Sequence, residues 1–575
     1  MVNQTTEQNT NAGQYLEEYE RWKQEATEDQ DIVSELHAMA SDEAAIEDAF
    51  YKNLSFGTGG LRGVIGAGTN RMNIYTVRKA SQGLSNYLNE QTRDGETPVV
   101  VIARDSRIKS DIFALAAAGV FAANGIKVHV FEQIIPTPLL SYAVRELHAS
   151  AGIVITASHN PAKYNGYKVY GSDGCQITTE TAKAIQTEIE KVDVFSGVRK
   201  MAGNELKDSG LVFFVGKDII DGFTEAVKAQ SVLYADEIDR NVDVVYSPLN
   251  GTGLEPVTRV LREAGFGNIT IVEEQREPDG HFPTCPKPNP EEREAMELGL
   301  EYCRRVNADL LLATDPDCDR CGIAVKAASG EYRLLSANET GILLLEYICS
   351  QRKKHGRMPS DPVFAKTIVT NDLAERIAAQ YGVKTVNTLT GFKFIGEVIG
   401  NLEEADRADD FIFAFEESYG YLAGTYARDK DGVVAAYLIV EMFAFYKTRG
   451  ISLLDKLEEL YKEYGYCLNT QHSYSFEGSA GMEKMQKIME DLRGGLDHIG
   501  GKSISKTLDY RNGIDDLPPS NVLKFLIDGG SVVVRPSGTE PKLKVYYSVT
   551  ADSEDAAQEM EEQLAGDLEK LYLQR

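Results

Sequence analysis

Short apolar runs alternate with amphipathic segments along most of this chain. Residues 98–103 form a continuous, β-branched run, which is typical of a strand buried on both faces. A polar turn at 104–110 and an Ala-rich helix through Ala123 come next, and they lead to further strands at 126–131 and 152–156. This alternation predicts a parallel sheet whose strands are joined by right-handed helical crossovers.

The same unit recurs twice more. Each copy closes with an apolar strand that runs directly into a polar loop, and ligands of parallel sheets gather at the carboxyl ends of the strands. We therefore expect three tandem α/β domains, each contributing one loop to a shared cleft. The second copy covers strands at 242–246, 269–272 and 309–313 with helices at 253–264 and up to Val306, and the third covers strands at 363–369, 384–387 and 411–415 with a helix at 372–381.

The two ends of the chain depart from this unit. Residues 15–39 are amphipathic and include the only Trp of the chain, Trp22, which predicts a helical opening. Near the C-terminus, strands at 531–534 and 544–549 flank a Gly/Pro loop, which indicates an antiparallel α+β domain. The predicted fold is α/β, with three tandem related domains of mixed or parallel sheets and a C-terminal α+β domain around a central cleft. The expected domain boundaries are 1–210, 211–325, 326–455 and 456–575.

The composition is that of a soluble globular protein, but its charge is strongly acidic. Of the 575 residues, 42% are hydrophobic and 26% are charged, and the formal net charge is −28. Such a charge repels nucleic acid and anionic membranes at long range, so we expect neither as a partner. A phosphorylated ligand requires a locally basic cleft, which directs attention to Arg and Lys residues in Gly-rich loops.

Cysteine use indicates a reducing compartment. Seven Cys residues in a chain of this length do not form a disulfide scaffold, and the single C-x-x-C pair, Cys318 and Cys321, has no second pair at zinc-site spacing. Residues 1–13 are polar and amide-rich, unlike a signal peptide. The longest apolar stretches are too short or too charged to span a membrane. We therefore expect a cytoplasmic protein.

Ser158 lies where a buried strand meets a turn. His159, Asn165 and Lys168 follow it within ten residues. A serine at such a place commonly caps the next element. A phosphoryl carrier, however, needs a cation nearby, which Lys168 supplies. The residues alone leave both interpretations open.

Three carboxylates, Asp315, Asp317 and Asp319, alternate along one loop after an apolar strand. They can converge on a hard cation, and without one their mutual repulsion is costly. The same D-x-D-x-D pattern begins an EF-hand loop, but that loop needs Gly at its sixth position and Glu at its twelfth, where this chain has Arg320 and Lys326. The pattern therefore favours a Mg²⁺-type site over a solvated acidic turn.

Two further loops carry groups suited to sugar and phosphate. Glu416 and Ser418 have the i, i+2 spacing that directs both side chains to one side of an extended chain, where they can bind vicinal sugar hydroxyls, although Glu-rich strand ends are also common without a ligand. Downstream, Arg428 and Lys430 can offset the charge of a phosphate. A guanidinium, two hydroxyls and a flexible backbone come together at Arg535, Ser537, Gly538 and Thr539. This composition is that of a phosphate cradle, and a plain hairpin loop is the alternative.

Two Gly-rich segments do not fit nucleotide-binding motifs. The segment 57–63 is similar to a dinucleotide loop, but its glycines are misordered and no strand leads into it. The segment 500–503 lacks the upstream Gly of a nucleotide-binding P-loop, because Leu496 stands at that position. Neither an NAD enzyme nor a nucleotide kinase is supported.

Four segments, in order and over nearly the whole chain, resemble the α-D-phosphohexomutase superfamily. Residues 156–161 resemble its phosphoserine loop, 315–320 its metal loop, 416–420 the sugar-binding loop of phosphoglucomutases and 535–541 its phosphate-binding loop. The resemblance implies four domains around one cleft, the fourth of them mobile. It also implies a Mg²⁺ ion held by a phosphate oxygen on Ser158 and by the carboxylates of Asp315, Asp317 and Asp319.

The resemblance also implies roles for single residues. Arg62 and Lys168 would be the acid/base and charge-stabilising groups near the transferred phosphoryl, and His159 is expected beside them. Two positions depart from the family pattern, because Cys318 and Phe415 stand where many members have Gly; all three Asp ligands remain, but the geometry of the sugar loop is affected. Substrate contacts are expected from Arg320, Thr390, Gly391, Lys393, Glu416, Ser418, Arg428 and Lys430.

The activity that the resemblance implies is interconversion of glucose 1-phosphate and glucose 6-phosphate through a phosphoserine at Ser158. Glucose 1,6-bisphosphate is then the intermediate and the primer, and a hexose phosphate is the substrate. Mannose and pentose phosphates remain alternatives with the same mechanism. A Mg²⁺-dependent sugar phosphatase, which passes its phosphoserine to water, is a rival of another class, and a catalytically idle binding protein is a third.

Overall fold

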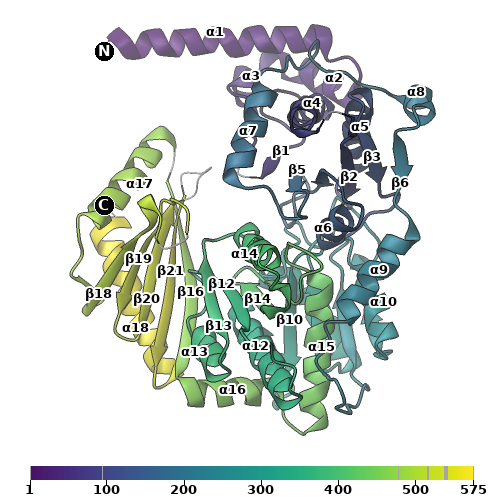
Figure 1. The fold of residues 1–575 in the computed structure, drawn as a ribbon. Helices are drawn as coiled ribbons and strands as arrows, with labels where there is room; N and C mark the ends of the chain where they lie inside the picture. Colours follow the sequence, from purple (N-terminus) through teal and green to yellow (C-terminus); the bar gives the residue numbers. More distant parts are fainter. Residues whose placement is uncertain are drawn as a thin grey trace.

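The computed structural model describes residues 2–57, 59–93, 95–476, 478–514, 517–536 and 542–573. Figure 1 shows four β-sheet regions that follow one another along the chain, with the C-terminal sheet beside the third region. Within the described ranges, we find no helix that combines the length and the apolar character needed to cross a membrane.

The helical opening predicted for 15–39 is broken into two helices. α1 (Val2–Glu25) ends, and α2 (Gln30–Ala38) begins at a new cap, where the Asp29 side chain accepts a hydrogen bond from the backbone N–H of Asp31. A carboxylate at this position satisfies a free N–H group of the first turn, so the sequence encodes a helix start inside the predicted helix.

The Trp of the chain anchors this opening to the first domain. Trp22 is fully buried and packs edge-on against Phe50 of α3 (Glu43–Phe50) and Tyr75 of α4 (Ile74–Gln91). Such aromatic pairs add to the stabilisation from burial. The N-terminal end of α1 extends away from the other elements (Figure 1).

The first sheet has helices on both faces, as a buried parallel sheet requires. Its strand order is β1-β5-β4-β2-β3-β6. Alternate residues of β2 enter two different hydrophobic clusters, one with α5 and the other with α6. The elements are β1 (Gly60–Val64), β2 (Val99–Arg104), α5 (Ser110–Ala123), β3 (Lys127–Val130), α6 (Thr137–Glu146), β4 (Ala151–Ile155), β5 (Tyr164–Gly171), α7 (Thr179–Glu190), α8 (Gly203–Asp208) and β6 (Val212–Phe214).

The predicted recurrence of the unit is confirmed in the second sheet, which has the order β11-β10-β9-β7-β8. Its parallel strands β9, β7 and β8 correspond to β4, β2 and β3 of the first sheet. The elements are α9 (Lys217–Lys228), β7 (Val244–Ser247), α10 (Leu254–Glu263), β8 (Ile269–Ile271), α11 (Arg293–Val306), β9 (Leu310–Thr314), β10 (Cys321–Lys326) and β11 (Tyr332–Leu335). The next helix, α12 (Ala337–Lys354), packs against the third sheet.

The third sheet repeats the arrangement in the order β13-β12-β14-β15. In all three copies the last parallel strand turns into an antiparallel neighbour, β5, β10 or β15, which the sequence patterns did not reveal. The elements are β12 (Val363–Thr367), α13 (Leu373–Gln380), β13 (Lys384–Thr388), α14 (Phe392–Glu404), β14 (Phe411–Glu416), β15 (Gly420–Leu422), α15 (Gly432–Thr448) and α16 (Leu453–Tyr464).

The C-terminal domain has the predicted antiparallel α+β character. Its strand order is β16-β21-β20-β19-β18-β17, and every pair is antiparallel. The elements are β16 (Tyr466–Ser475), α17 (Gly478–Arg493), β17 (His498–Ile499), β18 (Lys502–Asp509), β19 (Leu523–Ile527), β20 (Gly530–Pro536), β21 (Lys542–Ala551) and α18 (Glu554–Leu568).

The packing ties three domains together and leaves the fourth more separate. One continuous hydrophobic cluster includes residues of all three α/β domains, and α15, which is buried nearly all round, contributes many of them. The C-terminal sheet has its own cluster. It meets the third domain through a small apolar patch made of Ile368, Val369, Leu389, Tyr510, Val522, Val533 and Tyr546.

Candidate active site

The three loops between the paired strands share one backbone feature. Each contains a non-glycine residue with positive φ: 52° at Ser158, 51° at Cys318 and 64° at Tyr419. The loops contact one another, since the N–H of Cys321 donates to the carbonyl of Tyr419 at 3.1 Å. The N–H of Gly432 similarly donates to the carbonyl of Cys318 at 3.0 Å. Residues far apart in the sequence are therefore held in one rigid cluster.

Ser158 is buried at the centre of this cluster. Its Oγ donates a hydrogen bond to Oδ2 of Asp315 at 2.8 Å and lies 3.0 Å from Nδ1 of His159. Burial, together with the charges of Arg320 and Arg62, holds the pKa of His159 well below its usual value. A neutral imidazole at this distance can accept a proton from the serine hydroxyl.

The Ser158 loop is fixed by Arg107, a residue that the motifs did not single out. The buried guanidinium donates to the carbonyls of Ser158 and Asn160, and to those of Pro161 and Tyr164 at 3.0 Å. A hint was present in the sequence, because Arg107 belongs to the polar turn at the carboxyl end of β2.

Asp105, in the same turn, completes this support. Its carboxylate lies 3.4 Å from Nε of Arg107 and accepts a hydrogen bond of 2.6 Å from Oγ1 of Thr156. Thr156 in turn accepts from the backbone N–H of Ser158 at 2.8 Å. Burial raises the pKa of Asp105, although Arg107 opposes the shift. The turn after β2 thus holds the loop after β4.

Asp315, Asp317 and Asp319 converge as predicted. All three are fully buried, and one ligand atom from each lies within 4.8 Å of the others. Oδ1 of Asp317 and Oδ1 of Asp319 are buried and have no hydrogen-bond partner among the described residues. Burial, and then repulsion from Asp319 and Asp317, raises the pKa of Asp315 well above its usual value. Buried carboxylate oxygens that lack a partner among the described residues fit a hard divalent cation.

Two lysines, from the first and third domains, flank the carboxylates. Nζ of Lys168 lies 2.8 Å from Asp317 and 3.5 Å from Asp319, and Nζ of Lys430 lies 2.9 Å from Asp319. Burial lowers the pKa of both ammonium groups, but the neighbouring carboxylates outweigh it, so both pKa values are raised. Lys168 and Lys430 therefore remain charged.

The predicted sugar loop lies next to the acidic loop. Oγ of Ser418 donates to Oε1 of Glu416 at 2.8 Å, as the i, i+2 spacing predicted. Glu416 is buried, and its burial raises its pKa to about 7, although the charges of Lys430 and Arg320 oppose the shift. Arg320 pairs with Glu291 at 3.3 Å, and its backbone N–H donates to Asp315 at 3.0 Å.

The segment with Thr390, Gly391 and Lys393 precedes and begins α14. Gly391 has φ of 112°, a conformation that favours glycine, and this lets the chain enter the helix. Thr390 and Lys393 are half-buried. The carbonyl of Lys393 accepts a hydrogen bond from Sγ of Cys175, so this segment contacts the first domain.

Arg428 lies at the contact between the first and third domains. Its side chain has no exposed surface and pairs with Glu403, which also pairs with Arg145 of the first domain. The guanidinium therefore links the first and third domains through the shared partner Glu403. Arg62, by contrast, is exposed on β1.

The predicted phosphate cradle is described only in part. Arg535 lies near the end of β20, and the charges of Arg535, Glu417 and Glu291 all act on Lys544 of the neighbouring strand. Glu291 is also the partner of Arg320, so this end of the fourth domain is near the acidic loop. Ser537, Gly538 and Thr539 lie outside the described residues.

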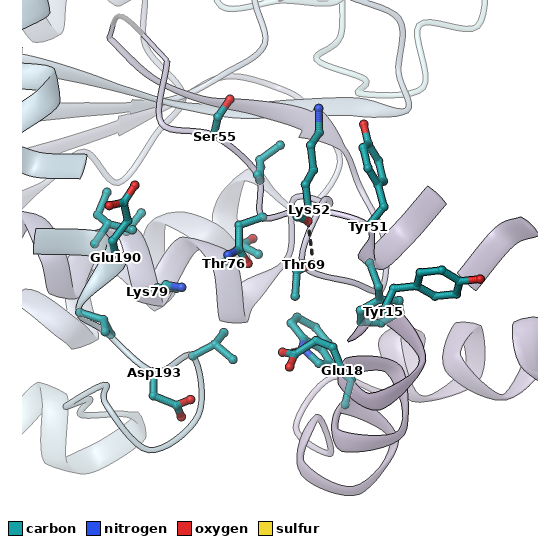
Figure 2. Close-up of a pocket in the computed structure, with 18 of the residues that line it drawn as sticks. Tyr15, Glu18, Tyr51, Lys52, Ser55, Thr69, Thr76, Lys79, Glu190 and Asp193 are labelled. Atoms are coloured by element: carbon teal, nitrogen blue, oxygen red, sulfur yellow. Dashed lines mark hydrogen bonds between the residues drawn. The ribbon is translucent and has the colours of Figure 1, made fainter. Parts of the chain in front are cut away.

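A separate cavity of about 690 Å³ lies in the first domain. Figure 2 shows that its wall includes Glu18 and Tyr15 of α1, Lys79 of α4 and Asp193. Among the predicted site residues that the structure describes, none lines it. Its position behind β1 makes it distinct from the cluster around Ser158.

Comparison with known proteins places the chain in a family. Residues 53–194 match the alpha/beta/alpha domain I of phosphoglucomutase/phosphomannomutase proteins, 221–330 match domain II, 336–464 match domain III and 477–566 match the C-terminal domain. A phosphoglucomutase of Staphylococcus haemolyticus is 36% identical over 536 residues, covering 91% of this chain and 95% of the relative. A phosphoglucomutase of Staphylococcus aureus is 36% identical over 532 residues, covering 89% and 93%.

Solved structures agree on the fold. A phosphoglucomutase/phosphomannomutase family protein of Burkholderia thailandensis has a TM-score of 0.66 at 19% identity and covers 90% of this chain and 97% of its own. The open form of the Paramecium phosphoglucomutase parafusin has a TM-score of 0.66 at 18% identity, covering 91% and 96%. With four domains matched in order, the chain belongs to the phosphoglucomutase/phosphomannomutase family, whose members are isomerases that interconvert phosphohexoses.

Proposed function

We propose that this chain is a phosphoglucomutase that interconverts glucose 1-phosphate and glucose 6-phosphate through a phosphoserine at Ser158. The observation that carries the proposal is the contact between Oγ of Ser158 and Oδ2 of Asp315, 2.8 Å apart, in a buried cluster of carboxylates and ammonium groups. A capping serine has no need of such surroundings, whereas a phosphoryl carrier does. The 36% identity to curated phosphoglucomutases supports glucose as the sugar.

Ser158, His159, Lys168 and Arg62 are assigned to the phosphoryl transfer. In the forward half-reaction, the P–O bond to Ser158 breaks as a new P–O bond forms to the free sugar hydroxyl, and the proton of that hydroxyl passes to the released Oγ of Ser158. In the return half-reaction, the Ser158 hydroxyl attacks the other phosphoryl, and neutral His159 accepts its proton. The P–O bond to the sugar breaks at the same time, and the released sugar oxygen takes a proton back from His159. Lys168 stays protonated, so it supplies charge and hydrogen bonds to the phosphoryl oxygens, as exposed Arg62 can from β1.

The acidic loop is proposed to hold Mg²⁺. Asp315, Asp317 and Asp319 would be its protein ligands, together with a phosphate oxygen on Ser158. The ion would neutralise charge on the phosphoryl group. The buried Oδ1 atoms of Asp317 and Asp319, which lack partners among the described residues, support this assignment.

Substrate recognition is assigned to the second, third and fourth domains. Glu416 and Ser418 would bind vicinal sugar hydroxyls, and Lys430 and Arg320 would offset the charge of the ligand. The segment with Thr390, Gly391 and Lys393 would contact the sugar from the third domain. The phosphate that is not being transferred would dock in the cradle proposed at Arg535, Ser537, Gly538 and Thr539.

The bisphosphate must reorient within the site so that its two phosphates exchange places, because the same cradle binds first one phosphate and then the other. Glucose 1,6-bisphosphate is therefore the intermediate, and it also primes an enzyme that has lost its phosphoryl group. Water would hydrolyse the phosphoserine during this step, so we expect the cleft to close around it. Rotation of the fourth domain, which meets the third through a small apolar patch, would provide the closure.

The test is a mutase assay with glucose 1-phosphate, Mg²⁺ and catalytic glucose 1,6-bisphosphate, run beside mannose 1-phosphate and ribose 1-phosphate. We expect glucose 6-phosphate to form fastest and to depend on the primer. Faster conversion of mannose or ribose phosphate would keep the chemistry and overturn the sugar assignment. Release of inorganic phosphate without isomer formation would identify a phosphatase instead.

A further inference from the structure

A buried tyrosine of the first domain reaches into the third domain beside the proposed active site. The hydroxyl of Tyr170, on β5, donates a hydrogen bond of 2.7 Å to Oδ2 of Asp429. Tyr170 has no exposed surface, and Asp429 is 4% exposed. Lys168 lies two residues earlier on the same strand, so its side chain and that of Tyr170 share one face of the sheet.

The other oxygen of Asp429 holds the residue that follows it. Oδ1 of Asp429 accepts a hydrogen bond of 2.8 Å from the backbone N–H of Lys430 and lies 3.5 Å from its Nζ. Nζ of Lys430 in turn lies 2.9 Å from Asp319. A continuous chain of contacts therefore runs from Tyr170 through Asp429 to Lys430 and ends on the acidic loop of the second domain.

Electrostatics explain why this link matters for Lys430. Lys168 and Lys430 approach the same carboxylate, that of Asp319, from different domains, so their positive charges repel. Asp429 opposes that repulsion, because its charge acts favourably on both ammonium groups. The Asp429 carboxylate can act on both ammonium groups only if its orientation is fixed, and the hydrogen bond from the Tyr170 hydroxyl fixes that orientation. Burial and the charge of Asp429 raise the pKa of Tyr170 well above its usual value, so the hydroxyl remains a donor.

We propose that Tyr170 and Asp429 are positioning residues that set the place of the Lys430 ammonium between the acidic loop and the sugar loop. Neither residue needs to touch the substrate. The proposal rests on the proposed function, since Lys430 is assigned there to offset the charge of the ligand. It adds a contact between the first and third domains on which turnover depends.

Tyr170→Phe removes one oxygen and leaves the ring. Tyr167→Phe is a matched control, because Tyr167 lies on the same strand, is equally buried and bonds through its hydroxyl to Ser81 at 3.0 Å, on the opposite face of the sheet. We expect both variants to shift the urea midpoint by similar amounts. Only Tyr170→Phe should lower kcat/KM for glucose 1-phosphate, by about 10-fold, the order expected when one charged group is misplaced.

A double-mutant cycle separates positioning from general stability. If Tyr170 acts through Lys430, then Tyr170→Phe should change kcat/KM by less than about 2-fold once Lys430→Met is present, because there is no ammonium left to position. A purely structural role predicts that the two losses multiply. Asp429→Ala offers a second route, should Tyr170→Phe fold poorly, and it should show the same loss and the same dependence on Lys430.

The outcomes distinguish this proposal from the proposed function. Wild-type kcat/KM in Tyr170→Phe, or multiplicative losses with Lys430→Met, overturns the positioning role while Ser158→Ala still abolishes mutase activity. Normal mutase activity in Ser158→Ala would instead overturn the proposed function. A loss equal in Tyr167→Phe and Tyr170→Phe would also contradict the positioning role, since it would reflect stability alone.

Discussion

Arg107 illustrates how much of this site depends on a residue whose hydrogen bonds go to backbone carbonyls. Its guanidinium bridges four carbonyls of the segment that contains Ser158, and its side chain has no exposed surface. A fork of five N–H donors can do this, whereas the single ammonium of a lysine cannot. The left-handed backbone of Ser158 is thereby held without any contact to the Ser158 side chain.

We predict that Arg107→Lys keeps the charge opposite Asp105 but loses most of these bonds. The free energy of unfolding should fall by about 2 kcal/mol, because several buried carbonyls lose donors. Turnover should fall by at least about 10-fold, because Ser158 is no longer fixed. Urea denaturation and the mutase assay measure the two effects. Retention of the wild-type kcat would show that Arg107 serves stability only.

Glu416 gives the clearest pH dependence. Its burial raises its pKa from an ordinary value of 4.5 to about 7. If the carboxylate must be ionised to accept sugar hydroxyls, kcat/KM should rise with pH through about 7. For stability the sign is opposite: the folded state binds this proton more tightly, so the contribution is present at low pH and is lost as pH rises through about 7.

Glu416→Gln is the control for both effects. The variant should lack the rising limb near pH 7 in kcat/KM. Its unfolding free energy should decline less than that of the wild type between about pH 5 and 7; part of the decline remains, because burial also raises the pKa of Asp431 to about 6. Any limb that persists belongs to another group, such as the substrate phosphate, whose second pKa is about 6. An unchanged profile in the variant would contradict the assignment of Glu416.

Among the elements, the hairpins after β4, β9 and β14 carry most of the proposed site residues, and the strands around them approach one another closely. Gly60 of β1 pairs with Lys168 of β5. A Cβ on Gly60 would lie 1.9 Å from the carbonyl oxygen of Tyr167, and its φ is 144°, so no other residue fits without displacing a strand. Arg62 lies two residues further along the same strand, so its place depends on this pairing.

Gly60→Ala should therefore separate β1 from β5. We expect the free energy of unfolding to fall by roughly 3 kcal/mol, from the clash and the strained φ together, and mutase activity to fall with it. Gly59→Ala is the matched control, because its Cβ would meet only the flexible end of the Gln176 side chain. Equal stability of the two variants, measured by thermal unfolding, would contradict this account of β1.

The sequence predicted most elements but not the hairpins, and the reason is physical. Continuous apolar strands such as β4 and β9 can be predicted from their composition, and the polar loops follow them directly in the sequence. The sequence of β5 does not predict a strand, because Asn165-Gly166 usually indicates a turn. Here Gly166 is required inside the strand, since a Cβ would lie 2.4 Å from the carbonyl oxygen of Thr156.

The site was predictable where it depends on local pattern and not where it depends on tertiary contacts. The Asp315–Asp319 alternation and the Glu416–Ser418 spacing each lie within one loop, so the sequence revealed them. Local spacing cannot predict a partner more than 50 residues away, and such distant contacts across strands or domains are made by Arg107, Asp105 and Tyr170. The same reasoning applies to Arg428, because no local pattern in the sequence indicates its pairing with Glu403.

At the scale of the whole molecule, Asp372 links the fourth domain to the third. Its carboxylate accepts a hydrogen bond of 3.0 Å from Ser531 of β20 and lies 3.5 Å from Nζ of Lys524 on β19. Lys524 also donates to the carbonyl of Ile368 at 3.0 Å. Together with the small apolar patch, these contacts are what a rotation of the fourth domain would have to loosen or carry with it.

Asp372→Asn should weaken the attachment of the fourth domain to the third without abolishing it. We expect faster amide hydrogen exchange in β19 and β20, with little change in the strands of the first three domains, because local opening follows the weakest interface. Faster hydrolysis of the phosphoenzyme should accompany it, if closure by the fourth domain excludes water. Unchanged exchange in β19 and β20 would show that Asp372 does not control the attachment.

If Ser158 carries the phosphoryl group between substrate molecules, a labelled phosphoryl group can be followed onto Ser158 and off it again. Purified protein is incubated with ³²P-labelled glucose 1,6-bisphosphate and Mg²⁺ and freed of ligand. One portion is mapped by peptide mass spectrometry, and another is chased with unlabelled glucose 1-phosphate. The account predicts one label on Ser158, its transfer to glucose 1,6-bisphosphate in the chase, and neither in Ser158→Ala. Label on another residue, or a chase that yields only inorganic phosphate, would contradict the account.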